Sequence, residues 1–509
     1  MVFKTGMDKS SPSILDLPPE LVAHIIHYTH HSEHFNFAST CRFLFNCSKD
    51  VLEAHRKTHK EYHTCSDVLP TTVPKLLRKI LDDPMVAWHV RSLEFYEMRD
   101  CWAWWRPCQF VSEKSSSVRG RGKPLPYALD QDERAGCLEV LREDLFFTES
   151  DLEKARADFE AGNDAPMKAL IVALCPRLES LKFSRDLIVS GRAAFDPLQS
   201  FPPRPLARDC QMGHRPQIPR SCLEYIQRAV LHYFSNTAGQ LKWPVGFSSL
   251  SDLTVGMQTD TDIDGMSTES PPCVLFDLMR LPNLTSVYWD WVDLGTNLDN
   301  KRDTCDLGIP RSSSSVQHIF IDMGFFLRTG ELLSIPRCLK SLAFADADMH
   351  LHHLPKLALA LQHESLESLM FYKSKLNEEH LWWERVQDPN FPFARLKSMT
   401  IDYYDFFRHL VEESGDAEGT EQSPARLNFS DWTKRRRLPR NLEVIVLAKS
   451  LWTDPLSETE ADEVDEAMLS LIASKATYIP NLKSIFLGAL EDESRSRWTT
   501  REYSTRTRR

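Results

Sequence analysis

Residues 14–62 decide how this chain begins to fold, and they read ILDLPPELVAHIIHYTHHSEHFNFASTCRFLFNCSKDVLEAHRKTHKEY. The Leu-Pro-Pro-Glu-Leu opening places proline at the start of a helix, where its missing N–H costs nothing. Glu20 falls in the first turn, where a negative charge complements the helix dipole. Leu21, Ile25 and Ile26 recur at helical spacing, so they predict one apolar helical face.

Two more helices are expected in this stretch. Beyond polar residues 29–34, a second helix is predicted by the apolar residues Phe35, Phe37, Ala38, Cys41, Leu44 and Phe45. A third, more charged helix should run from about residue 49 to 61. Three helices this short cannot bury all their apolar side chains among themselves. We therefore expect Leu17, Pro18, Leu21 and Ile25 to stay partly exposed for a partner.

The same residues resemble an F-box, the module by which substrate receptors dock onto the Skp-type adaptor of cullin–RING ubiquitin ligases. The matching positions are Leu17, Pro18, Glu20, Leu21, the Ile25-Ile26 pair, and the Cys41-Arg42 pair at the family's distance from it. The continuation through Tyr62 to DDPMVAWHVRSLEF at residues 82–95 looks like the fungal branch of F-box proteins.

The resemblance implies an adaptor-binding surface. Its residues would be Leu17, Pro18, Glu20, Leu21, Ile25, Ile26, Phe37, Cys41, Arg42 and Phe45. Thr29 and His34 depart from the family pattern, which usually has apolar residues there, and they should weaken the packing of the first helix on the second. The alternative to an F-box is an ordinary amphipathic helical hairpin at the start of a domain.

Composition narrows the class of protein. The chain has 509 residues, and 42% hydrophobic content allows a sizeable core. With 61 basic and 72 acidic residues, overall charge gives no support for a nucleic-acid partner. The apolar runs at residues 169–174 and 442–448 are too short to cross a membrane. Twelve scattered cysteines, and no signal peptide in residues 1–13, favour an intracellular protein in the cytoplasm, the nucleus or both.

Downstream, one six-residue pattern, L-x-x-L-x-φ with φ apolar, recurs ten times. The copies are VRSLEF (90–95), LESLKF (178–183), LSDLTV (250–255), LTSVYW (284–289), VQHIFI (316–321), LKSLAF (339–344), LESLMF (366–371), LKSMTI (396–401), LEVIVL (442–447) and LKSIFL (482–487). In each copy the last four residues alternate as a short strand does, while the first leucine anchors the preceding turn. These segments should pair as parallel strands in chain order.

Helix-like segments lie between the copies. They are residues 223–234, 274–281, 354–363, 376–386 and 463–473. One strand and one helix per unit resembles the leucine-rich-repeat arrangement, so the expected fold class is α/β: a three-helix F-box followed by an irregular leucine-rich-repeat-like solenoid. The spacing between copies varies from 23 to 88 residues, and the asparagine that usually follows each strand is absent. An α/β domain whose strands merely share a motif is the alternative.

These patterns divide the chain into a flexible N-terminus (1–13), an F-box-like module (14–62), a linker helix region (63–87), a repeat-like domain (88–490) and a flexible basic tail (491–509). Within the repeat-like domain, polar or proline-rich insertions are expected at residues 111–126, 195–219, 258–272, 296–315 and 412–437. The Lys434–Arg437 cluster at the end of the last insertion is equally consistent with a nuclear-localisation signal and a solvated loop.

No motif points to catalysis, a metal or a cofactor. The sequence contains no Walker, dinucleotide-binding, nucleophile-elbow or H-E-x-x-H pattern. Five histidines lie between His24 and His34, and three between His350 and His353; both groups are interpreted as exposed or turn residues. The tryptophans at 102–105 and 382–383 are assigned mainly to packing.

We therefore expect a non-catalytic subunit of a ubiquitin ligase that needs no cofactor. Its F-box would bind a Skp-type adaptor and, through it, a cullin, while the repeat-like domain would bind an unidentified protein substrate. The competing hypothesis is a repeat scaffold that acts outside the ubiquitin system.

Overall fold

The computed structural model describes most of residues 13–184 and, farther along the chain, shorter segments that include the strands. The described residues are 13–96, 99, 101–102, 105, 129–184, 221–235, 241–257, 272–293, 309–325, 329–345, 361–372, 393–402, 439–449, 469, 472–473, 475–477, 479–489 and 499–504. Outside them lie the insertions expected at 111–126, 195–219 and 412–437, most of those at 258–272 and 296–315, the helix expected at 376–386, the His350–His353 group and the Lys434–Arg437 cluster.

The N-terminal residues form a small helical unit. Its elements are η1 (Ile14–Asp16), α1 (Pro19–Tyr28), η2 (His31–Glu33), α2 (His34–Ser39), α3 (Arg42–Cys47) and α4 (Lys49–Tyr62). The expectation of one second helix is wrong, because the chain breaks between α2 and α3. The hydroxyls of Ser39 and Thr40 both donate to the carbonyl of Asn36, and Cys41 is extended with φ −159°. Such local bonds compete with a continuous helix.

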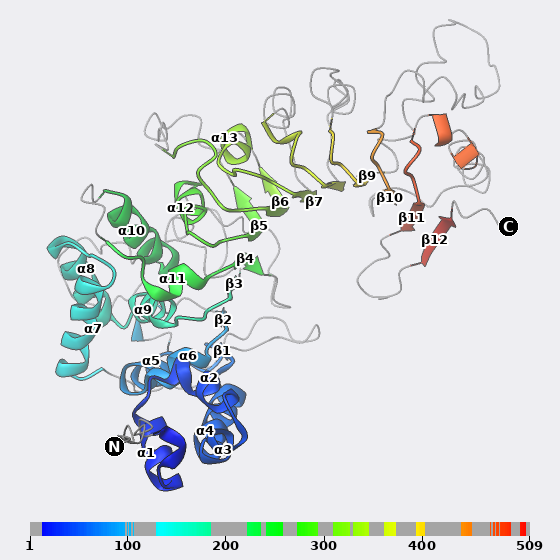
Figure 1. The fold of residues 1–509 in the computed structure, drawn as a ribbon. Coiled ribbons are helices and arrows are strands. Elements are labelled where there is room, and N and C mark those ends of the chain that lie inside the picture. The colour runs from blue at the N-terminus through cyan, green and yellow to red at the C-terminus, as the bar shows by residue number, and fades with distance from the viewer. Residues whose placement is uncertain are drawn as a thin grey trace, which may run out of the picture.

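Beyond this unit, the described residues contain twelve strands that form one open sheet in chain order (Figure 1). They are β1 (Thr64–Ser66), β2 (Ser92–Phe95), β3 (Ser180–Ser184), β4 (Asp252–Met257), β5 (Ser286–Asp293), β6 (His318–Phe325), β7 (Ser341–Ala345), β8 (Ser368–Tyr372), β9 (Ser398–Asp402), β10 (Val444–Lys449), β11 (Ser484–Ala489) and β12 (Thr499–Ser504). Neighbours from β1 to β11 pair in parallel, so the expected chain-order parallel pairing of the ten segments is confirmed.

Each of the ten predicted segments supplies one strand, from β2 to β11, and the same bonds join each unit to the next. The amides of Glu179 and Ser180 both donate to the Arg91 carbonyl, at 2.8 and 3.0 Å, and equivalent pairs recur up to Lys483 and Ser484 on Glu443. One row of side chains faces the core: Leu93, Leu181, Leu253, Val287, Ile319, Leu342, Leu369, Met399, Ile445 and Ile485 are all buried. Burial of this row explains why neighbouring strands keep their register.

Asparagine also joins neighbouring units, but at an unexpected position. Asn283 and Asn481 each precede an anchoring leucine and donate to the carbonyls of Ser248 and Arg440 in the preceding unit, at 2.5 and 3.3 Å. Asn441 makes the same bond to the Ala394 carbonyl. In the leucine-rich-repeat pattern the asparagine follows the strand, whereas these residues act before it.

The helices lie along one side of the sheet and cover its core (Figure 1). They are α5 (Thr72–Asp82), α6 (Pro84–His89), α7 (Gln131–Glu143), α8 (Glu149–Ala161), α9 (Ala165–Leu174), α10 (Cys222–Ser235), α11 (Val245–Ser249), α12 (Pro272–Leu278) and α13 (Thr329–Ser334). Helices α10 and α12 match the helices expected at 223–234 and 274–281. Among the described helices, none is both long and apolar enough to cross a membrane.

Three elements differ from the expectations. Residues 63–87, expected to be a linker with one helix, also contain β1 and most of α6, because Pro84 ends one helix and begins another. The tail was expected to be flexible throughout, yet residues 499–504 form β12, antiparallel to β11. Strand β11 would otherwise leave its outer backbone groups without a strand partner, and Thr499, Thr500 and Tyr503 of β12 are residue types that favour strands.

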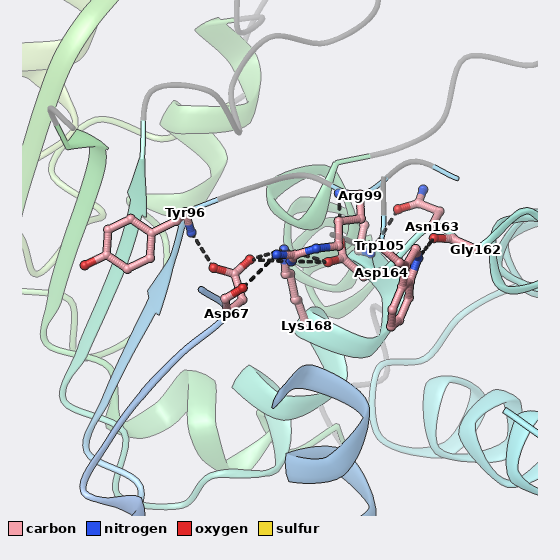
Figure 2. A network of polar contacts seen from close by, with 9 residues as sticks. Asp67, Tyr96, Arg99, Trp105, Gly162, Asn163, Asp164 and Lys168 are labelled. Carbon is pink, nitrogen blue, oxygen red and sulfur yellow. Dashed lines mark hydrogen bonds and ion pairs between the residues drawn. The ribbon is translucent and has the colours of Figure 1, made fainter. Parts of the chain in front are cut away.

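A buried ionic network fixes the first strands to α9 (Figure 2). The Lys168 ammonium lies 2.7 Å from Asp67 and 2.9 Å from Asp164, and the Arg99 guanidinium lies 3.2 and 3.3 Å from the same carboxylates. Asp67 also accepts from the Tyr96 amide at 2.6 Å. Burial alone would lower the pKa of Lys168, but the two carboxylates outweigh it and raise that pKa. The network therefore joins the ends of β1 and β2 to the first turn of α9.

Helix α11 approaches α9 so closely that only glycine fits at position 246. A Cβ there would lie 1.8 Å from the Val172 carbonyl oxygen. We expect Gly246→Ala to lower the free energy of unfolding by about 2 kcal/mol, since overpacking a core costs about 1–3 kcal/mol. Gly136→Ala on α7 is the matched control: no atom lies within 4 Å of the added methyl group, so it should be neutral or stabilising by about 0.5–1 kcal/mol. Urea midpoints of the full-length variants check both values, and equal effects would contradict this packing.

Candidate functional site

Helix α1 separates its apolar residues onto two faces. Val22 and Ile26 are completely buried against Leu44 of α3 and form the small core of the helical unit. On the other face, Leu21 and Ile25 keep 51% and 40% of their surface exposed, and Tyr28 keeps 77%. This residue spacing gives α1 one face for folding and another that its own unit does not cover.

The start and end of α1 are fixed locally. Ser13 caps the preceding turn η1 by accepting from the Leu15 amide, while its own amide donates to Asp16. Glu20 lies in the first turn of α1. At the other end, the Thr29 hydroxyl donates to the Ile25 carbonyl at 2.8 Å. These bonds define the length of the helix and so the position of its exposed face.

The exposed face of α1 forms the wall of a surface hollow. Its lining residues are Leu17, Leu21, His24, Ile25, Tyr28 and Thr29. Further exposed apolar side chains from the same unit are Leu15, Phe35 and Phe45. Grouped exposed leucine, isoleucine and aromatic residues are typical of a protein-binding surface.

The ten residues expected to bind the adaptor occupy different environments. Pro18, Glu20, Leu21, Ile25, Arg42 and Phe45 are exposed; Leu17, Phe37 and Cys41 are half-buried and pack on the small core; Ile26 is fully buried. Ile26 therefore supports α1 from behind and cannot contact a partner directly in this conformation. Exposure of Leu17, Pro18, Leu21 and Ile25, as expected, is confirmed.

Sequence reasoning missed two exposed residues beside this face. Tyr28 lies one turn after Ile25, and Leu15 lies in the turn before α1. Helical spacing from Leu21 and Ile25 could have found Tyr28, since residues three and seven apart share a face.

Thr29 and His34, the two residues that depart from the family pattern, are in direct contact. The His34 ring is buried, and its Nε2 lies 2.9 Å from the Thr29 carbonyl. The expectation that the first histidine group is exposed is thus wrong for His34, although it holds for His24, His27 and His30. Among the described residues, no three His, Cys, Asp or Glu side chains are placed to hold a metal ion.

Comparison with known proteins agrees with this geometry. Residues 14–54 match the family model described as F-box domain. No curated protein matches the chain. The match begins at η1 and ends within α4, so it contains both the small core and the exposed face of α1. Over residues 14–54, the N-terminal helical unit of this chain is similar to an F-box domain.

Proposed function

We propose that this protein is a substrate-recognition subunit of an SCF-type ubiquitin ligase, with no catalytic activity of its own. The exposed face of α1 carries the proposal: within the F-box match, Leu21, Ile25 and Tyr28 remain accessible while the opposite side of α1 packs on α3. A Skp-type adaptor would cover this face and connect the chain to a cullin. The receptor would then act by raising the local concentration of a substrate beside the ubiquitin-carrying enzyme.

We also propose that the chain belongs to the fungal branch of F-box proteins, and that its sheet is a leucine-rich-repeat-like solenoid that binds the protein substrate. The regular strand order and the repeated backbone bonds support it. Charges pair across neighbouring units: Lys182 of β3 with Glu94 of β2 at 2.9 Å, and Lys397 with Glu367, which directly precede β9 and β8, at 2.7 Å. In the units between these pairs, Tyr288 of β5 and Phe320 of β6 stack at 4.9 Å and are half-buried. Aromatic side chains are frequent binding anchors.

Affinity purification of the tagged full-length chain from cells tests the ligase assignment. Recovery of a Skp-type adaptor and a cullin is the expected result, and the protein should act in the cytoplasm, the nucleus or both. Recovery of other proteins without adaptor or cullin would favour a repeat scaffold outside the ubiquitin system.

The substrate side needs a separate variant. We expect Tyr288→Ala with Phe320→Ala to reduce substrate recovery at least about tenfold, because interface anchors typically contribute more than 1 kcal/mol each. Adaptor recovery should not change, since both residues lie in β5 and β6 and not in the F-box. Quantitative mass spectrometry of the purified complexes measures both. If the double variant and the wild type recover all proteins other than the adaptor and the cullin equally well, the substrate binds elsewhere on the chain.

A further inference from the structure

Three buried histidines form a continuous hydrogen-bonded chain between the F-box and the α/β unit. His34 comes from α2 and His55 from α4, both in the F-box module, while His89 ends α6, which leads into β2. His34 Nδ1 lies 2.9 Å from His55 Nε2, and His55 Nδ1 lies 2.7 Å from His89 Nε2. All three rings are buried.

The Thr29 carbonyl fixes the direction of every bond in this chain. A carbonyl only accepts, so His34 Nε2 must carry the proton that it donates to Thr29. In a neutral His34 ring, Nδ1 is then the acceptor, and His55 must donate to it through Nε2–H. By the same argument, His55 Nδ1 accepts from His89 Nε2–H. Three neutral rings, all protonated on Nε2, satisfy the whole chain.

The row of three rings can accept one additional proton without losing a hydrogen bond, but not two. One proton entering at His89 Nδ1 can reverse both ring-to-ring bonds and leave His34 doubly protonated, with every contact preserved. A second proton places two N–H groups opposite each other at a nitrogen–nitrogen distance below 3 Å, so a bond must break. Two adjacent buried cations would also repel each other.

The surroundings add little negative charge to offset these protons. Asp83 is the carboxylate that acts on His55, but its side chain already caps α6 by accepting from the Met85 amide at 2.9 Å. His31 of η2 and His59 of α4 face the three rings. Arg91, which directly precedes β2, and Arg177, in the turn before β3, help to lower the pKa of His89. Apart from Asp83, these groups all disfavour a positive charge on the rings.

We propose that His34, His55 and His89 form a proton-sensitive latch that holds the F-box against α6 when the rings are neutral and releases it on acidification. This latch belongs to the chain itself and does not depend on the proposed ligase function. Its neighbours would open with it, because Trp88 of α6 packs on His31 of η2 with the ring centres 5.1 Å apart.

The sign of the pH dependence follows from burial. Burial lowers the pKa of His55 and His89 to about 4, from an ordinary value of 6.5. The open state therefore binds more protons than the latched state between these values. Latch stability is complete above pH 6.5 and falls as the pH decreases towards about 4. At about pH 5.5, release of the His55 or the His89 ring favours opening by on the order of tenfold for each of these two rings.

Hydrogen–deuterium exchange of the full-length protein tests this inference. Protection is compared at about pH 7.5 and about pH 5.5, corrected for the intrinsic exchange rate, with β6 and β7 as internal references. We expect α2, α4 and α6 to lose protection at least about tenfold relative to the references. His55→Gln can still donate and accept but cannot bind a proton in this range, so it should remove most of that difference. His24→Gln, at an exposed histidine of α1, is the matched control and should behave as wild type.

Two results would overturn the latch: wild-type α2, α4 and α6 with no pH-dependent loss beyond that of β6 and β7, or an undiminished loss in His55→Gln. If His55→Gln fails to fold, His89→Gln, at the other end of the row of rings, takes its place as the test variant. The wild-type comparison between the two pH values also decides without any variant.

Discussion

Replacing Leu21 and Ile25 together with aspartate is expected to weaken binding of a Skp-type adaptor at least about 100-fold. Each side chain presents about half of its surface on the exposed face of α1. Burying an aliphatic side chain fully contributes about 1.5–3 kcal/mol, and an aspartate in its place must also lose water. Two such losses exceed about 3 kcal/mol, and every 1.4 kcal/mol is about tenfold in affinity. Titration of purified adaptor by calorimetry or interferometry measures the effect.

The matched control for this variant is Leu69→Asp with Leu81→Asp. These leucines are 54% and 45% exposed, close to the values for Leu21 and Ile25, but they lie beyond the F-box match. The control should bind the adaptor as wild type does. Both double variants should keep the wild-type melting curve, because none of the four side chains is buried. Equal weakening by the two variants would mean that the α1 face is not the docking surface.

Replacing Lys168 with methionine is expected to lower the free energy of unfolding by about 3–5 kcal/mol. The change leaves the carboxylates of Asp67 and Asp164 buried with Arg99 as the remaining cation of the network, and breaking a buried ion pair from one side typically costs that much. Methionine keeps most of the side-chain volume, so the loss reports charge and not packing.

Lys182→Met provides the comparison. Lys182 pairs with Glu94 at 2.9 Å but remains partly exposed, so its loss should cost about 1 kcal/mol or less. Chemical denaturation of the full-length variants, followed by tryptophan fluorescence, measures both changes. A Lys168→Met protein as stable as Lys182→Met would show that the network does not hold α9 to the first strands.

The repeated strands could be predicted from sequence because local and long-range signals agree there. In LESLKF and its equivalents, alternation sets which residues face the core, and the leading leucine sets where each strand begins. The structure adds the reason for their order: each unit donates two amides to one carbonyl of the preceding unit. Such bonds require neighbours in space, which no single six-residue segment can reveal.

The F-box was recognisable for a similar reason, since its leading helix carries a local pattern. The split between α2 and α3 was not, because apolar spacing continues through Thr40 and Cys41 while hydroxyl bonds to Asn36 interrupt the backbone. His34 was misjudged because a histidine in a polar stretch is usually exposed. Its burial depends on His55 and His89, which are 21 and 55 residues away in sequence.

The buried ionic network was also beyond sequence reasoning. Asp67, Arg99 and Lys168 lie in segments with no shared motif, and charged residues are rarely buried unless paired. Only the parallel pairing of β1 with β2, and the placement of α9 behind them, brings these charges together. Similarly, β12 becomes predictable only once β11 is known to offer an edge.

Adaptor docking through α1 is tested most directly by the hydrogen–deuterium exchange footprint of a purified Skp-type adaptor on the full-length chain. We expect new protection in residues 15–28 and 35–45, around Leu21, Ile25 and Phe45, and none in β5 to β8, where the substrate is proposed to bind. Protection confined to the strands, or no protection anywhere in the presence of saturating adaptor, would contradict it.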